Sequence, residues 1–333
     1  MPIRRALLRS LIVVACMAAA GSAFGFDKIT IVVNGIERQN TLPVALTQQL
    51  GYFKEQGLDV ELQSDATGVD AETEMLTGAA QGVVGFYDHC VDLQSKGKLV
   101  ESVVQFGQTP GEVVLVSTRH PEIKSAADLK GREVGVTALG SSTEFLLSYL
   151  AAKNGLKRDE YAPVPVGLGK TFISAMQQDR IQAGMATEPT ISQMLTSGEA
   201  RILVDMRTLE GTRAALGGTY PAASLYMPTA WVDAHKDETQ RLVNAFVRAL
   251  HYIASHSAEE IADRMPKDYY AGDKDRYVKA LAGGKATFTA DGRMPEGGPQ
   301  TVLAVLGRFS KELQGKTIDL SRTYTSAFVD NVK

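Results

Sequence analysis

The sequence predicts an α/β protein of two lobes, each a mostly parallel sheet flanked by helices. Stretches rich in β-branched residues alternate with helical patterns, and this alternation restarts near Ile123. Such alternation is typical of parallel sheets covered by helices on both faces. The chain has 333 residues and is 44% hydrophobic, which suits two cores better than one.

The elements expected in the first part of the chain follow from local patterns. Asn40-Thr41-Leu42-Pro43 gives a polar cap and an early proline for one helix that continues through Phe53 and ends at Gly57. A second helix opens at Val69-Asp70 and ends before Gly78. Strands are expected at residues 28–33, 59–62, 82–86, 103–106 and 113–116, the last two flanking a Pro110-Gly111 turn.

The second part repeats this order. Pro163 and Pro165 make the stretch between them a poor central strand, because proline cannot donate to the ladder. Apolar residues from Leu242 to Ile253 recur at helical spacing and predict a long amphipathic helix near 237–256. The other expected elements are strands at 133–136 and 183–186 and helices opening near Gly140 and around Phe172.

Residues 1–25 are expected to form an export signal. Arg4 and Arg5 precede an apolar stretch that runs to Ala20, and small residues follow, with cleavage favoured after Gly25 over Ala23. Removing this segment, which carries three arginines and no acidic residue, changes the net charge from −3 to −6. A basic surface for nucleic acid is therefore not expected. No later apolar run approaches the roughly 18–20 residues of a membrane span.

The two cysteines carry different expectations. Val13-Val14-Ala15-Cys16 loosely fits a lipoprotein box, so a lipid anchor at Cys16 is the less favoured alternative to a free periplasmic form. Only Cys90 would remain after cleavage, which excludes an internal disulfide. His89-Cys90 could supply a base and a nucleophile if the chain turns there; otherwise Cys90 packs as a small hydrophobe and His89 lines a cleft.

The motif Gly140-Ser141-Ser142-Thr143-Glu144 follows a strand and opens a helix, and it has two interpretations. Ser141 and Glu144 could form a capping box, with each side chain bonded to the other residue's amide. Alternatively, the amides and hydroxyls at this helix end could hold an anionic group. Glu144 would oppose an anion unless it points away. The motif alone leaves both open.

At this point the chain resembles the solute-binding proteins of the nitrate/sulfonate/taurine-type ABC transporters, which are related to thiamine-precursor pyrimidine-binding proteins. Most of the chain up to about residue 256 takes part. The matching stretches are Pro43-Val44-Ala45, residues 51–60, residues 125–131 with Val134 and Gly140-Ser141-Ser142, residues 182–184 with Glu188-Pro189, and the helix from Leu242 to Ile253.

The resemblance implies a two-lobed periplasmic-binding-protein fold (type II) with ligand between the lobes. Lobe 1 would comprise residues 26–112 plus 222–333 and lobe 2 residues 113–221, with crossings near 108–113 and 217–222. The ligand-binding residues that it implies are Asn40, Gly68, Tyr87, Asp88, His89, Ser141, Ser142, Thr143, Glu188 and Tyr220. No catalytic residue, metal or cofactor is expected.

The implied function is capture of a small organic solute for an ABC permease and ATPase complex, by a protein expected to be a monomer. Asp88 and Glu188 would make parts of the cleft acidic, so a sulfonate or an aromatic or heteroaromatic acid fits better than a bare anion. A pyrimidine thiamine precursor is the alternative solute. An enzyme on the same scaffold that uses His89 or Cys90, and a ligand-sensing subunit, are rival functions.

Overall fold

The protein is described by a computed structural model that covers residues 27–65, 67–313 and 315–332. The expected signal segment 1–25 and the alternative anchor Cys16 lie outside these residues. Among the described residues, no helix combines the length and apolar character that crossing a membrane requires.

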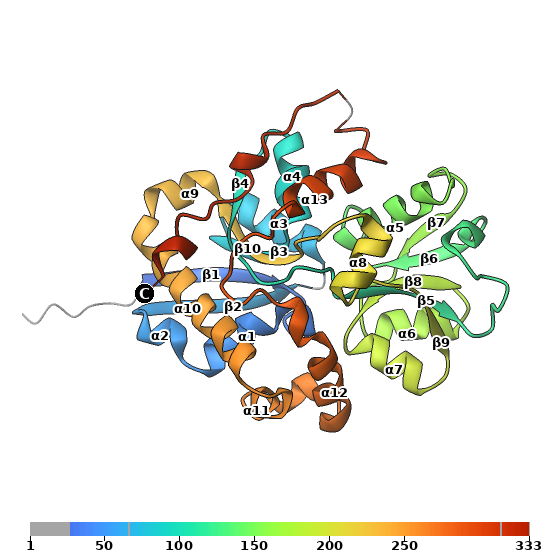
Figure 1. The fold of residues 1–333 in the computed structure, drawn as a ribbon, viewed down its shortest axis with the longest axis horizontal. Helices are drawn as coiled ribbons and strands as arrows, with labels where there is room; N and C mark the ends of the chain where they lie inside the picture. The colour runs from blue at the N-terminus through green and yellow to red at the C-terminus, as the bar shows by residue number, and fades with distance from the viewer. Residues whose placement is uncertain (1–26, 66, 314, 333) are drawn as a thin grey trace, which may run out of the picture.

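Two five-stranded sheets organise the molecule (Figure 1). We call the part built on the sheet β2-β1-β3-β10-β4 the first lobe and the part built on β7-β6-β8-β5-β9 the second lobe. In the first sheet β1, β2 and β3 pair in parallel, and β10 is antiparallel to both β3 and β4. The second sheet repeats this arrangement with β5 as the opposed strand. The predicted α/β class is confirmed, with four strands of each sheet running one way.

The strands of the first sheet are β1 (Asp27–Asn34), β2 (Leu58–Asp65), β3 (Gly82–Phe86), β4 (Val100–Gln105) and β10 (Ala223–Pro228). Those of the second sheet are β5 (Glu112–Ser117), β6 (Glu133–Val136), β7 (Ala162–Pro165), β8 (Ala183–Thr187) and β9 (Ala200–Asp205). The proline-flanked β7 lies at a sheet edge, as its sequence predicts.

Helices cover both sheets. Around the first sheet these are α1 (Leu42–Gln49), α2 (Tyr52–Glu55), α3 (Gly68–Leu76), α4 (Asp88–Ser95), α9 (Thr229–Ala234), α10 (Lys236–Ser255), α11 (Ala258–Ala262), α12 (Lys274–Gly284) and α13 (Gly298–Gly307). Around the second they are α5 (Ser142–Lys153), α6 (Lys170–Gln177), α7 (Thr190–Thr196) and α8 (Leu209–Leu216). Short 3₁₀ segments include η1 (Gln39–Thr41) and η4 (Lys285–Thr287).

The chain passes to the second lobe between β4 and β5 and returns between α8 and β10. The two connections lie against each other: the Tyr220 amide donates to the Gln108 carbonyl at 3.2 Å and the Ala222 amide to the Gly107 carbonyl at 3.1 Å. The two lobes therefore share one hydrogen-bonded joint. The lobe boundaries at 112/113 and 221/222 stay a prediction.

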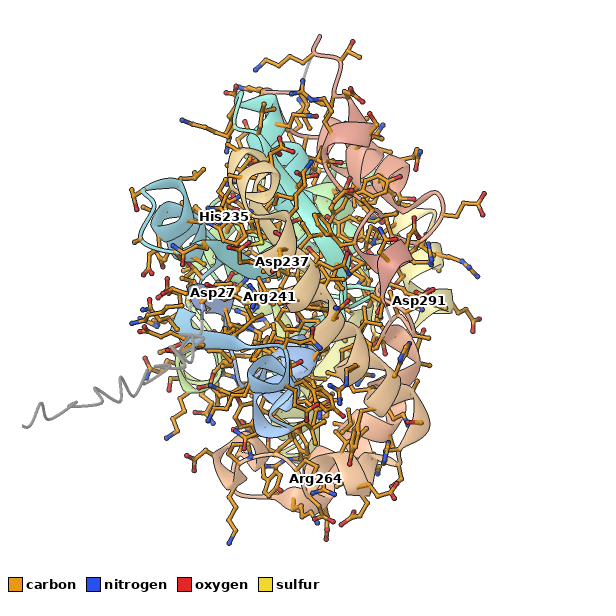
Figure 2. The ribbon with its side chains drawn as sticks, turned by 90° about the vertical axis from the view of Figure 1, so that its left-hand side faces the viewer. Asp27, His235, Asp237, Arg241, Arg264 and Asp291 are labelled. Carbon is orange, nitrogen blue, oxygen red and sulfur yellow. The ribbon has the colours of Figure 1, made fainter. Side chains whose placement is uncertain are left out.

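Helix α10 anchors the first lobe, and its amphipathic pattern is confirmed. Its Phe246 meets Phe53 edge-on at 5.2 Å and Phe106 at 5.0 Å between ring centroids. On the outer surface (Figure 2), Arg241 pairs with Asp237 one turn earlier and with Asp27 at the start of β1.

One predicted helix is divided in two. The expected helix through Phe53 ends at Gln49, and α2 begins at Tyr52. Gly51 adopts φ +74° between them, a left-handed conformation that breaks the helix and that glycine accepts at little cost.

Candidate functional site

Polar side chains from the two lobes meet inside the molecule, between the starts of α4 and α5. Ser142 of α5 donates its hydroxyl to Asp88 Oδ1 at 2.8 Å, and the same Oγ lies 3.1 Å from His89 Nε2. Asp88 and His89 open α4 and have no exposed surface, and Ser142 is 5% exposed. The lobes are thus joined by a buried polar contact.

His89 is held from its other side by Glu72 on α3. Its Nδ1 pairs with Glu72 Oε1 inside the first lobe. Burial alone would lower the pKa of His89, but the charge and hydrogen bond of Glu72, helped by Asp88 and Asp92, outweigh it and raise the pKa to about 9. At neutral pH the ring is therefore an imidazolium, so Nε2 carries a proton that it directs at Ser142.

Asp88 accepts a second hydrogen bond, from the Tyr220 hydroxyl to Oδ2 at 2.7 Å. Burial raises the pKa of Asp88, while His89 and the Tyr220 and Ser142 hydroxyls favour the carboxylate. Tyr220 lies in the returning connection between the lobes. Glu72, Asp88, His89, Ser142 and Tyr220 form what we call the buried cluster.

Gly68, the first residue of α3, makes room for this cluster. A Cβ at position 68 would lie 2.9 Å from His89 Nε2 and 3.1 Å from Asn34 Nδ2. Because the nearest atom belongs to a ring held by Glu72 and Ser142, a larger residue would displace His89. Gly68 therefore contributes by letting the backbone of α3 lie close to His89.

Ser141 and Thr143 are buried at the same helix start, but their hydroxyls bond the loop that precedes α5. The Ser141 hydroxyl donates to the Ala138 carbonyl at 2.7 Å, and Thr143 Oγ1 accepts from the Thr137 amide at 2.9 Å. The two hydroxyls also bond each other at 2.7 Å. Of the three hydroxyls predicted here, Ser142 alone reaches the first lobe.

The capping-box interpretation of this motif is wrong. Ser141 makes no side-chain cap bond; Glu144 instead accepts from the Gly140 amide at 2.6 Å and pairs with Arg158 at 2.7 Å. The loop preceding the helix keeps the Ser141 hydroxyl on Ala138, out of reach of the helix amides. Glu144 therefore points away from the cleft.

Tyr87 is not brought to the buried cluster. Its hydroxyl bonds the Thr323 hydroxyl, and its ring meets Tyr324 edge-on at 6.3 Å. The side chain thus faces the C-terminal segment. This orientation speaks against the expected role of Tyr87 as a ligand contact.

Asn40 and Glu188 line a pocket of about 400 Å³ between the lobes. Glu188 accepts from the Ser192 amide and hydroxyl, each at 3.0 Å, and lies 3.6 Å from Arg207. Gly111, in the outgoing connection, also lines this pocket. The ten predicted residues thus divide between the buried cluster with the adjoining Gly68, the loop before α5, this pocket and, for Tyr87, the contact with the C-terminal segment.

Two further buried ionisable groups, Arg38 and Glu112, lie near the joint and were not predicted. Burial raises the pKa of Glu112 to about 8, against the opposing effect of Arg38. Burial likewise lowers the pKa of Arg38 to about 10, although Glu112 favours its charged form. Arg38 precedes η1 and Glu112 opens β5, so the two groups that influence each other's pKa come from different lobes.

Cys90 lies outside the candidate chemistry. Its side chain has no exposed surface and belongs to the apolar core. Burial raises the pKa of its thiol well above the usual value, so a thiolate is disfavoured. Within the described part of the chain, no group of three or more His, Cys, Asp or Glu side chains is placed to hold a metal ion.

Comparison with known proteins identifies a family to which the chain is similar. The family model described as NMT1/THI5 like matches residues 38–260. A curated relative, 4-amino-5-hydroxymethyl-2-methylpyrimidine phosphate synthase THI11 of Saccharomyces cerevisiae, is 26% identical over 162 residues, which are 49% of this chain and 46% of that protein. The chain spans about half the length of the first curated relatives that it matches.

Solved structures show the same architecture. One from Bordetella bronchiseptica RB50 is 36% identical with a TM-score of 0.87, covering 91% of this chain and 96% of that one. The alkanesulfonate-binding protein SsuA from Xanthomonas axonopodis pv. citri, bound to MOPS, is 15% identical with a TM-score of 0.72, covering 90% of this chain and 98% of that one. The latter likeness establishes the periplasmic-binding-protein fold and leaves the ligand open.

Proposed function

The chain belongs to the NMT1/THI5-like family, and from that premise we propose that it is the extracytoplasmic solute-binding component of an ABC importer. It would take a small organic solute between its lobes and close around it by motion at the shared joint. Solved structures with this fold include the ligand-binding component of an ABC-type import system from Staphylococcus aureus.

The observation that carries this proposal is the contact of Ser142 with Asp88 and His89. A hydrogen bond contributes only about 1 kcal/mol net because water replaces it when the lobes part, so this polar contact, unlike the apolar packing of Phe145 and Leu306 beside it, adds little to the cost of opening. On opening, Asp88 and His89 would face the cleft as an acceptor and a donor that Glu72 and Tyr220 already hold in place.

The favoured solute is a sulfonate or an aromatic or heteroaromatic acid. A bare inorganic anion would meet the Asp88 and Glu188 carboxylates and has no apolar part to bind elsewhere, so it would gain little. A larger acid can present a donor or a ring to these groups, while its anionic group pairs with a cation in another part of the site. The MOPS-bound sulfonate-binding relative is consistent with this class.

A pyrimidine is the second candidate, and one observation favours it. Asp88 Oδ1 and His89 Nε2 lie 3.9 Å apart and present an acceptor beside a donor, both now occupied by the Ser142 hydroxyl. An amino group next to a ring nitrogen would satisfy both. The curated relatives are named as pyrimidine phosphate synthases.

We favour a binder over an enzyme on two grounds. Cys90 is packed in the apolar core, and its raised thiol pKa makes it a poor nucleophile. Ser142, His89 and Glu72 are linked as in a hydrolase, but an imidazolium with a pKa of about 9 cannot accept a proton from Ser142 at neutral pH.

We also propose a cellular location and transport partners. A cleaved segment 1–25 would deliver a free periplasmic monomer to a permease and ATPase complex, with a Cys16 anchor as the alternative. Neighbouring genes for a permease and an ATPase would separate transport from a sensing role.

Thermal-shift and calorimetric titrations with sulfonates, aromatic acids and pyrimidines test the binding function. Ser142→Ala should weaken the binding of a sulfonate or an aromatic acid by about tenfold, because the buried Asp88 carboxylate loses a donor in the closed form. Ser148→Ala is the matched control, since it removes an equally buried serine hydroxyl that bonds Tyr161 within α5's own lobe at 3.2 Å.

The two variants separate the outcomes. Ser148→Ala should lower thermal stability and leave affinity unchanged. Equal affinity of Ser142→Ala and the parent would remove Ser142 from the closing contact, and silence of the folded parent toward all three solute classes would refute the proposed solutes.

A further inference from the structure

We infer that the pocket between η1, α7 and α12 holds the acidic group of the solute, and that Lys279 and Arg276 of α12 are its cationic partners. This rests on the proposed binding function and adds the position and chemical class of one end of the ligand. Neither residue was singled out from the sequence.

The pocket is built from both lobes. Asn40 and the α12 residues come from the first lobe, whereas Glu188, Ser192 and Arg207 come from the second. Its volume of about 400 Å³ lies in the range of small-molecule sites. A molecule bound there would touch both lobes and the outgoing connection at Gly111, so its binding would be coupled to closure.

The lining suits an organic acid. Carbon atoms of Leu195 and Phe288 offer an apolar surface for a ring or chain. Arg207, Arg276 and Lys279 contribute three cations, against the single carboxylate of Glu188. This combination of an apolar surface with fixed cations is what an aromatic carboxylate or sulfonate requires.

The state of each charged group identifies the available cations. Arg207 is engaged by Asp205, at 2.7 Å and 3.0 Å, and neighbours Glu188. Arg276 pairs with Asp273 at 3.3 Å through Nη1 and donates from Nη2 to the Ala271 carbonyl at 3.3 Å. Lys279 has no carboxylate within 4.0 Å among the described residues. Positions 276 and 279 share one face of α12, so the two cations can meet one anion.

Glu188 does not cancel these charges, because its carboxylate is already compensated. Ser192 donates two hydrogen bonds to it, and Arg207 lies on its other side. The pocket therefore presents donors and available cations to a ligand rather than an open carboxylate.

The start of α5, the other expected anion site, is less suitable. The Ser142 hydroxyl is committed to Asp88, and those of Ser141 and Thr143 are used within their loop. An anion there would lie beside the buried carboxylates of Asp88 and Glu72, which already compensate the His89 imidazolium and oppose a further negative charge at low dielectric. The acidic end of the solute is thus better placed in the pocket.

Calorimetry with benzoate, benzenesulfonate and the neutral benzamide tests this inference. The parent should bind the two anions more tightly than benzamide. Lys279→Gln should weaken both anions by about tenfold and leave benzamide unchanged. Lys54→Gln is the matched control: it removes the same charge from an exposed position on α2, outside the pocket, and should bind all three probes like the parent.

The outcomes distinguish this inference from the binding function on which it rests. Equal affinity for benzoate and benzamide, unchanged anion binding by Lys279→Gln, or binding of other solutes without either anion would overturn the inference alone. A folded parent that binds neither these probes nor any sulfonate, aromatic acid or pyrimidine would overturn both. A tenfold loss confined to the anions in Lys279→Gln would support it.

Discussion

At the scale of single residues, the protein places a charged histidine in its interior and supplies the charges that keep it there. His89 is fully buried, with Glu72 on Nδ1 and Ser142 and Asp88 on the Nε2 side. A buried charge is stable only when it is paired and hydrogen-bonded. Glu72 therefore holds His89 in place from the Nδ1 side.

The raised pKa of His89 makes stability depend on pH in a defined direction. Its folded value of about 9 lies above the usual 6.5, so its stabilising contribution is complete below about pH 6.5 and is lost as the pH rises through 9. The pKa of Glu112 is raised to about 8, so this group also makes the folded protein less stable as the pH rises. The parent should therefore be less stable at about pH 10 than at about pH 6.

Glu72→Gln should reduce this pH dependence, because removing the neighbouring charge lowers the pKa of His89. Urea unfolding at about pH 6 and about pH 10 measures how much unfolding free energy is lost between the two pH values. This loss should be smaller in the variant than in the parent, by at most about 3 kcal/mol. Glu74→Gln on the same helix is the control. An unchanged pH dependence in Glu72→Gln would exclude the Glu72–His89 pairing.

Individual site residues were predictable to different degrees. Gly68, Asp88, His89, Ser142 and Tyr220 were expected from the family resemblance, and the structure gathers them. Glu72 was not expected, because α3 carries acidic residues at 70, 72 and 74 and only packing distinguishes the buried one. Lys279 and Arg276 lie beyond the stretches that carry the resemblance, so no local signal pointed to them.

At the scale of elements, the positions of β1 to β8 and of the long α10 follow from sequence patterns, whereas β9, β10 and the helices after α10 were not predicted. The long α10 and the edge position of β7 were predicted. The four-residue α2 was predicted as part of α1, because the left-handed Gly51 that separates the two helices does not interrupt the apolar pattern of the sequence. Likewise, Ser-Ser-Thr-Glu at the start of α5 fits a capping box in sequence, and only the preceding loop decides against it.

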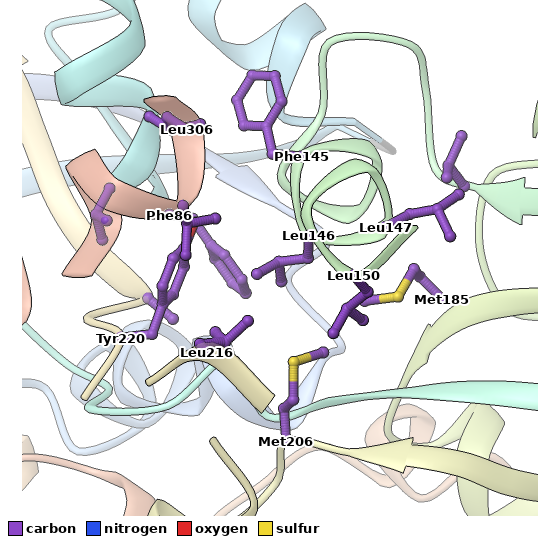
Figure 3. Packing of buried hydrophobic residues seen from close by; sticks show 14 of the residues in the cluster. Phe86, Phe145, Leu146, Leu147, Leu150, Met185, Met206, Leu216, Tyr220 and Leu306 are labelled. Atoms are coloured by element: carbon purple, nitrogen blue, oxygen red, sulfur yellow. The ribbon is translucent and has the colours of Figure 1, made fainter. Parts of the chain in front are cut away.

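Helices α5 and α13 form an apolar seam beside the buried cluster. Phe145 of α5 lies 5.9 Å from Phe309, just beyond α13, between ring centroids. Figure 3 shows Phe145 and Leu146 of α5 and Leu306 of α13 in the same packed group. Because α13 also packs on α4 of the first lobe, this seam favours the closed arrangement.

Phe309→Ala should weaken the seam and reduce the population of the closed form. Solute affinity should fall by about two- to tenfold, the range expected for an aromatic pair. Phe328→Ala truncates an aromatic residue in the core of the first lobe and should lower stability without this loss of affinity. Calorimetry checks both, and parent-like binding by Phe309→Ala would argue against a role in closure.

At the scale of the whole molecule, each sheet contains one strand that opposes the other four, and in each case this strand follows a connection between the lobes. The two connections are hydrogen-bonded to each other at Gln108–Tyr220 and Gly107–Ala222. Motion at this joint would part Ser142 from Asp88 and open the pocket at Gly111. The architecture thus suits capture and release better than a fixed catalytic centre.

Equilibrium dialysis of the folded protein against a mixture of sulfonates, aromatic acids and pyrimidines, followed by mass spectrometry, tests this account most directly. We expect one solute class to be retained at one molecule per chain and to be recovered with its mass unchanged. Retention of none of these solutes, or recovery of a retained solute in a chemically altered form, would contradict the account.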